Sequence, residues 1–260
     1  MSTQPANQKT TDGQNAIPPA PRVYVRAGFK WDGQDAYLFD IDGTLLRCRD
    51  RVHVNAFTSS IQRVTGFEVT LAGISMQGST DTAILREAWR LAGIADELLE
   101  PQAEAILEAM CSVVAERRHE MQLVRMPGVE EALRHLAARG ALLGIATGNL
   151  EAIGWIKVEG IGLREWFRFG GFSDRYPDRR ELIAKAAEKA REMAGAEANV
   201  CVVGDTPRDI DAARANSLSV IAVATGRFSF DELLEQKPDA CATSLADLLA
   251  HQRDQSRNEP

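Results

Sequence analysis

Four short apolar runs alternate along the chain with longer amphipathic stretches. The runs consist mostly of Val, Ile, Leu, Ala and aromatic residues, a composition typical of parallel strands that are buried on both faces. The stretches between them carry apolar residues at helical spacing, and Gly140 and Gly195 are expected to end two of these helices. This alternation predicts an α/β fold with a doubly wound, mainly parallel sheet. The expected strands are Ala36–Phe39, Leu142–Ala146, Val200–Val203 and Val220–Val223, and the expected helices include Gly128–Arg139, Glu151–Gly160, Arg180–Met193 and Asp209–Ala215.

One long interval, residues 48–126, departs from this alternation. It contains almost no strand-like run and instead shows three helical patterns, Val54–Val64, Thr82–Ala92 and Ala103–His119. We therefore expect an all-helical domain inserted into the α/β core after its first strand. Pro127 and Gly128 mark the return to the core. The expected boundaries are a disordered tail at 1–22, a core formed by 23–47 and 127–250, the helical insert at 48–126, and a polar tail at 251–260.

Composition and charge argue against several classes of binding partner for this protein. The 260 residues include 30 basic and 37 acidic side chains, which give a net charge of −7 and argue against nucleic-acid binding. No run approaches the ~20 apolar residues needed to span a bilayer, so no membrane partner is expected. The four cysteines lie far apart in the sequence, a spacing that disfavours a zinc site or a disulfide framework. These features favour a cytoplasmic protein.

Acidic residues follow the expected strands. Asp40 and Asp42 end the first strand two positions apart, so their side chains can face one site, and Asp205 and Asp209 follow the third. The carboxyl ends of parallel strands share one edge of the sheet, where Thr147 also lies. Two carboxylates ~4 Å apart repel by about 4 kcal/mol at an effective dielectric of about 20, so a cation or protons must neutralise them. Hard oxygen ligands favour Mg²⁺.

The order of these motifs resembles the haloacid dehalogenase superfamily. The resemblance rests on Asp40-Ile-Asp42-Gly-Thr-Leu at the first strand, Thr147 after the second, and Gly204-Asp-Thr-Pro-Arg-Asp209 after the third of these strands. It covers residues 34–250 and is closest to the phosphatase branch with a helical cap, which includes phosphoglycolate phosphatase-like enzymes. It implies a Rossmann-like core, with the helical insert as the cap. It also implies hydrolysis of a small phosphorylated metabolite.

The resemblance implies a role for each motif residue. Asp40 would be the nucleophile and form an aspartyl-phosphate, while Asp42 would act as general acid and then general base. Thr147 and the backbone amides of Gly148 and Asp42 would hold the phosphoryl group. The implied Mg²⁺ site consists of Asp40, the backbone carbonyl of Asp42, Asp205, and Asp209 acting through water or as a support for the other ligands.

A basic residue that contacts both nucleophile and phosphate is also expected from the resemblance. The family often places a lysine shortly before its last motif, but residues 173–180 contain none. We hypothesise that Lys157 fills this role, because a lysine on so apolar a helix is costly unless it reaches water or an anion. A lysine that merely extends to solvent is the alternative, and Arg175 and Arg180 are the rival cations.

Two other functions stay open. A β-phosphoglucomutase-like mutase is suggested by His53, near the place where such mutases carry a histidine, although the cap lysine that they also use is missing. A receiver-like module that only accepts phosphate on Asp40 shares the sheet but lacks the helical insert. In the cap, Ser75–Gly78 is a candidate substrate-facing loop, and Asp81 is interpreted as the N-cap of the helix that follows. Arg47, Arg49 and Arg51 are candidates for attracting an anionic substrate.

Overall fold

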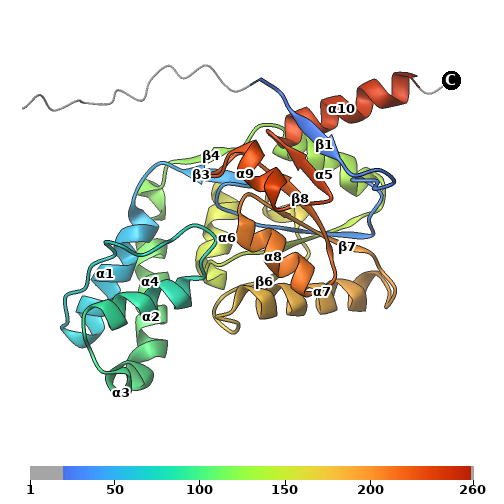
Figure 1. Ribbon diagram of the computed structural model, residues 1–260. Helices are drawn as coiled ribbons and strands as arrows, with labels where there is room; N and C mark the ends of the chain where they lie inside the picture. Colours follow the sequence, from blue (N-terminus) through green and yellow to red (C-terminus); the bar gives the residue numbers. More distant parts are fainter. Residues whose placement is uncertain (1–19, 259–260) are drawn as a thin grey trace, which may run out of the picture.

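The computed structural model describes residues 20–258 and shows a seven-stranded sheet that carries a helical domain at one end (Figure 1). The strand order is β1-β9-β8-β7-β2-β5-β6, and all neighbours are parallel except β1 and β9. The predicted fold class is therefore confirmed. The strands of this sheet are β1 (Val23–Val25), β2 (Ala36–Phe39), β5 (Leu142–Ala146), β6 (Phe169–Gly171), β7 (Val200–Gly204), β8 (Ser219–Val223) and β9 (Ala240–Ala242).

Strand β2 lies inside the sheet, between β7 and β5, and is fully buried. Ala36 pairs with Leu142 of β5 on one side and with Val200 of β7 on the other. Alternate side chains enter two separate apolar layers: Tyr37 and Phe39 face one and Leu38 the other. The first layer is covered by α5 (Val129–Ala138), α6 (Glu151–Gly160) and α10 (Leu245–Asn258), and the second by α7 (Arg179–Ala194), α8 (Pro207–Ala215) and α9 (Phe230–Glu235).

The helical cap has its own apolar core. Buried side chains that include Phe57, Trp89 and Met110 come from different cap helices and pack together. Leu150 and Ile153, at the start of α6, complete this cluster, so the cap rests directly on a core helix. The cap helices are α1 (Val52–Thr65), α2 (Asp81–Leu91), α3 (Asp96–Leu99) and α4 (Ala103–Glu116), with short 3₁₀ turns at Glu100–Gln102 and Arg118–Glu120.

Two short strands connect cap and core. Strands β3 (Leu46–Cys48) and β4 (Leu123–Arg125) form an antiparallel pair, which the sequence pattern did not reveal. Asp50, just beyond β3, accepts hydrogen bonds from the backbone amides of Val52 at 2.8 Å and Gln122 at 2.6 Å. The chain therefore enters and leaves the cap at one place, and the Asp50 side chain links the segment that enters the cap to the segment that leaves it.

The ends of the chain differ from the expected tails. Residues 1–19 of the expected N-terminal tail lie outside the described residues, while Arg22 forms an exposed ion pair with Asp231 at 2.7 Å. At the other end α10 continues to Asn258, so a helix occupies most of the segment expected to be a polar extension from His251. A further 3₁₀ turn spans Arg164–Trp166. No helix within residues 20–258 is long and apolar enough to cross a bilayer.

Candidate active site

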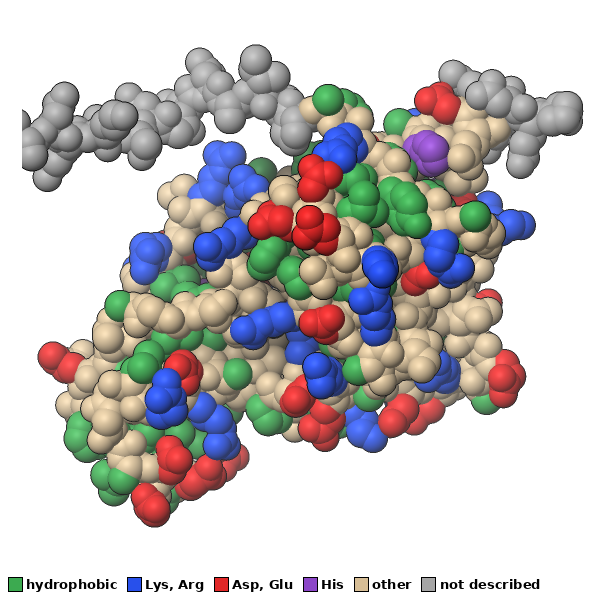
Figure 2. All heavy atoms as spheres, viewed as in Figure 1, with side chains coloured by type: hydrophobic (Ala, Val, Ile, Leu, Met, Phe, Trp, Pro, Cys, Tyr) green, Lys and Arg blue, Asp and Glu red, His purple; other side chains and the backbone are tan. Residues whose placement is uncertain are grey.

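A cavity of about 440 Å³ lies between the cap and the carboxyl ends of β2, β5 and β7. The space-filling view shows basic side chains along the boundary between the two domains, and Arg47 and Arg227 line the cavity (Figure 2). Its core-side lining consists of the predicted motif residues and a few neighbours: Asp40, Asp42, Gly43, Thr147, Gly148, Asn149, Lys157, Arg179, Asp205, Thr206 and Gly226. The three motifs therefore converge, as the strand ends predicted.

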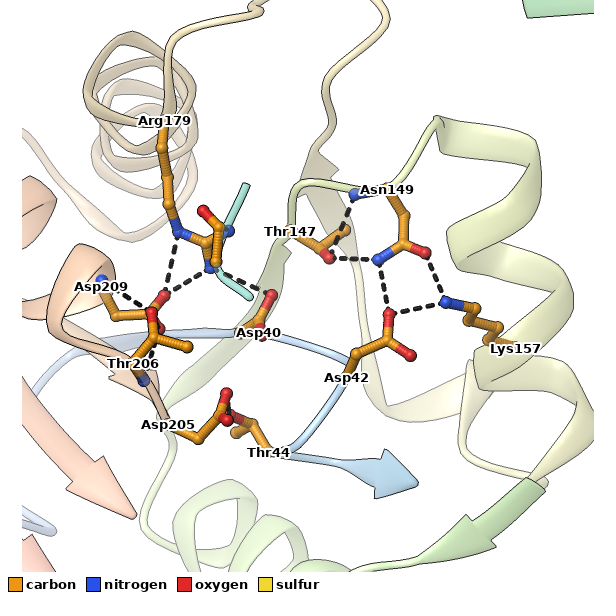
Figure 3. A network of polar contacts seen from close by, with 11 residues as sticks. Asp40, Asp42, Thr44, Thr147, Asn149, Lys157, Arg179, Asp205, Thr206 and Asp209 are labelled. Carbon is orange, nitrogen blue, oxygen red and sulfur yellow. Dashed lines mark hydrogen bonds and ion pairs between the residues drawn. The ribbon is translucent and has the colours of Figure 1, made fainter. Parts of the chain in front are cut away.

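Asp40 and Asp42 reach this cavity from one strand end but face different cations (Figure 3). Asp40, which directly follows β2, is 5% exposed, and its Oδ1 lies 3.1 Å from Nη2 of Arg179. The Asp42 side chain keeps 41% exposure, and its Oδ2 lies 2.6 Å from Nζ of Lys157. The two neighbouring carboxylates thus have different environments, which is the condition for dividing chemical roles between them.

Arg179 is the basic residue that reaches Asp40, in place of the predicted Lys157. Its side chain is 8% exposed and also contacts Asp209, at 2.5 Å. Burial lowers its pKa, but the carboxylates of Asp209 and Asp40 outweigh that effect and raise it above its ordinary value. Both rivals named above, Arg175 and Arg180, are exposed. The signal in the sequence that could have identified Arg179 is Asp178, because it is the N-cap of α7 and so places Arg179 at the first helical position.

Lys157 contacts the carboxylate of Asp42 and not that of Asp40, which was the expected partner. Its side chain is 2% exposed, and its ammonium group contacts Asp42 at 2.6 Å, Asn149 Oδ1 at 2.7 Å and His53 Nδ1 at 3.1 Å. Burial opposes the charge of Lys157, but Asp42 outweighs it and raises the lysine pKa. Burial likewise pushes the pKa of Asp42 upward, and Lys157 more than compensates and lowers it. Lys157 therefore holds Asp42, whereas contact with Asp40 belongs to Arg179.

The loop after β5 supplies uncharged polar groups. Thr147 is fully buried, and Asn149 Nδ2 donates to its Oγ1 at 2.8 Å and to Oδ2 of Asp42 at 2.8 Å. Asn149 thereby links the hydroxyl predicted to bind phosphate with the predicted acid, a role not assigned from the sequence. A Cβ atom on Gly148 would overlap the backbone carbonyl of Ser79 in the cap, so glycine permits this close approach of cap and loop.

Three carboxylates, Asp40, Asp205 and Asp209, offer oxygen atoms within 4.8 Å of one another. Burial, followed by the charges of Asp40 and Asp209, raises the pKa of Asp205 to about 9, and burial is also the main cause of the raised pKa of Asp40, about 6. A Cβ atom on Gly43 or Gly226 would overlap the Asp205 carboxylate, so both glycines leave room for it. This crowded set of hard oxygen donors fits a small divalent cation such as Mg²⁺.

The members of this cluster differ in how freely they can bind a cation. Asp209 is occupied by protein contacts: its Oδ1 meets Arg179, and its Oδ2 accepts from the amide and hydroxyl of Thr206. The Asp205 carboxylate has a single long hydrogen bond of 3.4 Å, from Thr44, among those recorded for the described residues. Asp205 and Asp40 are therefore the better placed ligands, with Asp209 as their support. The Asp42 side chain instead faces Lys157.

The cap covers the other side of the cavity. Met76, Gln77 and Gly78 line it, in agreement with the loop predicted to face the substrate, whereas Arg49 and Arg51 are exposed and outside the lining. The lining also includes His53, Val54, Phe57, Ser79, Asp81 and Ile84. Arg47 lines the cavity while donating to the carbonyl of Thr225 at 2.9 Å.

Comparisons with known proteins show the family and the fold to which this site belongs. Two phosphoglycolate phosphatases are similar in sequence: that of Nitrosococcus oceani is 22% identical over 81% of this chain and 93% of the relative, and that of Pseudomonas savastanoi pv. phaseolicola is 26% identical over 82% and 77%. The crystal structure of a hydrolase from Pseudomonas syringae shares the fold, with a TM-score of 0.62 and 22% identity over 85% of this chain and 99% of that one. The family model for haloacid dehalogenase-like hydrolases matches residues 34–216, and the chain therefore belongs to that family.

Proposed function

We propose that the protein is a Mg²⁺-dependent phosphatase that hydrolyses a small phosphate monoester through an aspartyl-phosphate on Asp40. The observation that carries this proposal is the separation of the two carboxylates: Arg179 lies against Asp40 and Lys157 against Asp42. One carboxylate is thereby paired for attack on phosphorus, and the other for proton transfer. Membership of a hydrolase family and similarity to phosphoglycolate phosphatases support the same reaction class.

The first half of the reaction transfers the phosphoryl group to the protein. An Oδ atom of Asp40 attacks phosphorus, the bond from phosphorus to the ester oxygen breaks, and protonated Asp42 gives its proton to the departing alcohol. Thr147, the amide of Gly148 and the Arg179 guanidinium would hold the phosphoryl oxygens. Mg²⁺, held by Asp40 and Asp205 with Asp209 in support, would offset the negative charge of these oxygens and of the carboxylates.

The second half releases phosphate. Asp42, now a carboxylate, takes a proton from water, the water oxygen attacks phosphorus, and the bond to Asp40 breaks to return the free carboxylate. The lowered pKa of Asp42 beside Lys157 keeps the side chain ionised in the free protein, so its protonation for the first half must accompany binding of the phosphate monoester. Asn149 and Lys157 fix the orientation of Asp42 through its Oδ2 atom, which is the atom that both of them contact.

Release of inorganic phosphate from p-nitrophenyl phosphate tests the proposal directly. We expect multiple turnovers with Mg²⁺, loss of turnover with a chelator, and loss of turnover in Asp40→Asn. The matched control is Asp211→Asn, which removes an exposed carboxylate from α8 and is expected to keep activity. Undiminished turnover by Asp40→Asn would refute Asp40 as the nucleophile. A single equivalent of phosphate retained on the protein would instead support the receiver-like alternative.

The natural substrate is best sought among small phosphorylated acids and sugars. The relatives named above make phosphoglycolate the first compound to test. The mutase alternative is favoured by one observation, the contact of His53 with Lys157 beside Asp42. It predicts that a sugar phosphate is converted to an isomeric phosphate without release of inorganic phosphate, which chromatography of the products would distinguish from hydrolysis.

A further inference from the structure

Asp81, the first residue of α2 in the cap, does not have the role that its position suggests. The N-cap of α2 is Thr80, whose hydroxyl accepts the amide of Ala83 at 3.2 Å. Asp81 is 4% exposed, so its carboxylate is buried although it lies in the first turn of a helix. A buried carboxylate is costly unless several donors satisfy it, and its partners therefore reveal what it is placed to do.

All the recorded hydrogen-bond partners of the Asp81 carboxylate lie outside its own helix. Its Oδ2 accepts the backbone amide of Leu150 at 2.9 Å and contacts His53 Nε2 at 3.0 Å. Its own amide donates to the carbonyl of Gly148 at 2.7 Å. Leu150 precedes α6, which has no side-chain cap within its own segment. A residue of the cap thus completes the amino end of a core helix, where a negative charge is favourable.

The segment that Asp81 fastens belongs to the catalytic machinery. Gly148 and Leu150 flank Asn149, which contacts both Thr147 and Asp42, and α6 carries Lys157. On its other side Asp81 contacts His53, whose second ring nitrogen lies 3.1 Å from Lys157. Both routes from Asp81 therefore lead to groups that hold Asp42. The contacts of Asp81 with Gly148 and Leu150, and that of His53 with Lys157, join the cap to the core and exist only while the two lie together.

We infer that Asp81 is a positioning residue that makes the order of the Thr147–Leu150 loop depend on closure of the cap. With the cap closed, Asp81 holds Gly148 and Leu150, and the loop presents Thr147 and Asn149 to the cavity. With the cap displaced, the amide of Leu150 and the carbonyl of Gly148 lose their partners, and the loop keeps only its contacts with the core. Catalysis is thereby restricted to the closed form. This inference rests on the proposed function only in its kinetic part.

Hydrogen–deuterium exchange of the full-length protein without ligand tests the inference independently of activity. In Asp81→Ala we expect the peptide that contains Leu150 to exchange about tenfold faster or more, because a charged acceptor has been removed from a backbone amide. Helix α4, in the same cap, serves as the internal reference and is expected to exchange at its wild-type rate. Asp81→Asn keeps an acceptor oxygen and should restore most of the protection.

The kinetic arm uses p-nitrophenyl phosphate with Mg²⁺. We expect kcat of Asp81→Ala to fall about tenfold or more with little change in KM, and Asp81→Asn to recover part of it. Asp96→Ala, which removes an exposed carboxylate from the first turn of α3 in the cap, is the matched control and should behave as wild type. Wild-type exchange at Leu150 in Asp81→Ala would overturn the inference, as would a kcat within about twofold of wild type.

The two proposals fail in different ways. Asp40→Asn is expected to lose turnover while the Leu150 peptide exchanges as in wild type, since Asp40 has no contact with Asp81 among the recorded bonds. If no phosphatase activity is found, the exchange experiment still decides whether Asp81 holds the loop. If Asp81→Ala is unfolded, a folded Asp81→Leu variant replaces it, because leucine is of similar size and has no acceptor. Wild-type exchange and kcat in that variant would overturn the inference.

Discussion

Arg179 Nη2 lies 3.1 Å from Asp40 Oδ1, so a buried guanidinium contacts the carboxylate proposed to attack phosphorus. The same nitrogen lies 2.5 Å from Asp209 Oδ1, and the cation therefore joins the nucleophile to the acidic cluster. A guanidinium presents several donors in one plane, so it can keep these carboxylates and still offer a donor to a phosphoryl oxygen.

Replacing Arg179 should therefore impair both chemistry and stability. We expect Arg179→Lys to lower kcat/KM by about 10²–10³, because a point charge cannot replace the planar fork. Arg179→Ala should also destabilise the fold by about 3–5 kcal/mol, since it leaves Asp209 buried without its cation. Kinetics and thermal denaturation would measure the two effects. Arg180→Ala, an exposed neighbour, is the control, and equal losses in Arg180→Ala and Arg179→Lys would contradict the assignment.

Lys157 should matter most for substrates whose leaving group needs a proton. Its ammonium and Asn149 together fix Asp42, so Lys157→Met is expected to lower kcat by about 10²–10⁴ with an alkyl phosphate. The loss should be smaller with p-nitrophenyl phosphate, whose leaving group departs readily as an anion. Steady-state kinetics with both substrates would test this. Equal losses would show that Lys157 acts on binding or folding rather than through Asp42.

The stability of the metal-free protein should depend on pH through the protonation of Asp205. Its pKa is raised to about 9, from an ordinary 3.8, by burial and then by Asp40 and Asp209. The folded chain therefore retains a proton that the unfolded chain loses, and stability falls as the pH rises from about 4 towards about 9. Mg²⁺ binds the ionised carboxylate, so the increase in Tm on adding Mg²⁺ should be larger at about pH 8.5 than at about pH 6.

Thermal shift measurements at several pH values, with and without Mg²⁺, would show this trend. Asp205→Asn serves as the comparison, because it removes both the proton and a ligand, and its Tm should be nearly independent of Mg²⁺. A stabilisation by Mg²⁺ that is the same across the pH range would argue against a protonated Asp205 in the metal-free protein.

Gly43 is expected to be essential for the same site. Its φ of +91° disfavours any other residue, and a Cβ atom would overlap the Asp205 carboxylate. Gly43→Ala should therefore displace Asp205 and weaken Mg²⁺ binding by about tenfold or more, in the range seen when groups that orient metal ligands are lost. Calorimetric titration with Mg²⁺ would measure the change. Gly28→Ala, at a φ of +78° with open space around it, controls for backbone strain alone.

The sequence predicted the elements whose side chains are buried on both faces. The four apolar runs became β2, β5, β7 and β8, because a parallel strand covered by helices cannot tolerate polar residues. Short strands at or next to the edges of the sheet escaped prediction: β6 contains two glycines, and β1 and β9 have three residues each. Such segments depend on pairing with neighbours rather than on a local pattern.

The candidate site was predictable where it follows a strand end and less so where it depends on a helix. Asp40, Thr147 and Asp205 follow β2, β5 and β7, so the topology alone brings them together. Arg179 and Arg180 are adjacent in the sequence but point in different directions from α7. The start of that helix at Asp178 decides which of them faces Asp40, and a helical pattern locates such boundaries poorly.

The connection made by β3 and β4 has an evolutionary consequence. Because β3 and β4 are hydrogen-bonded to each other, the segment between Cys48 and Leu123 is an inserted domain whose two chain connections to the core lie side by side. Insertions, deletions or larger replacements within this inserted domain leave the register of the seven-stranded sheet unchanged, because β3 and β4 form a separate sheet. A lineage can thus acquire new specificities by rebuilding the rest of the cap, provided that it keeps His53 and Asp81, whose contacts reach the reaction centre.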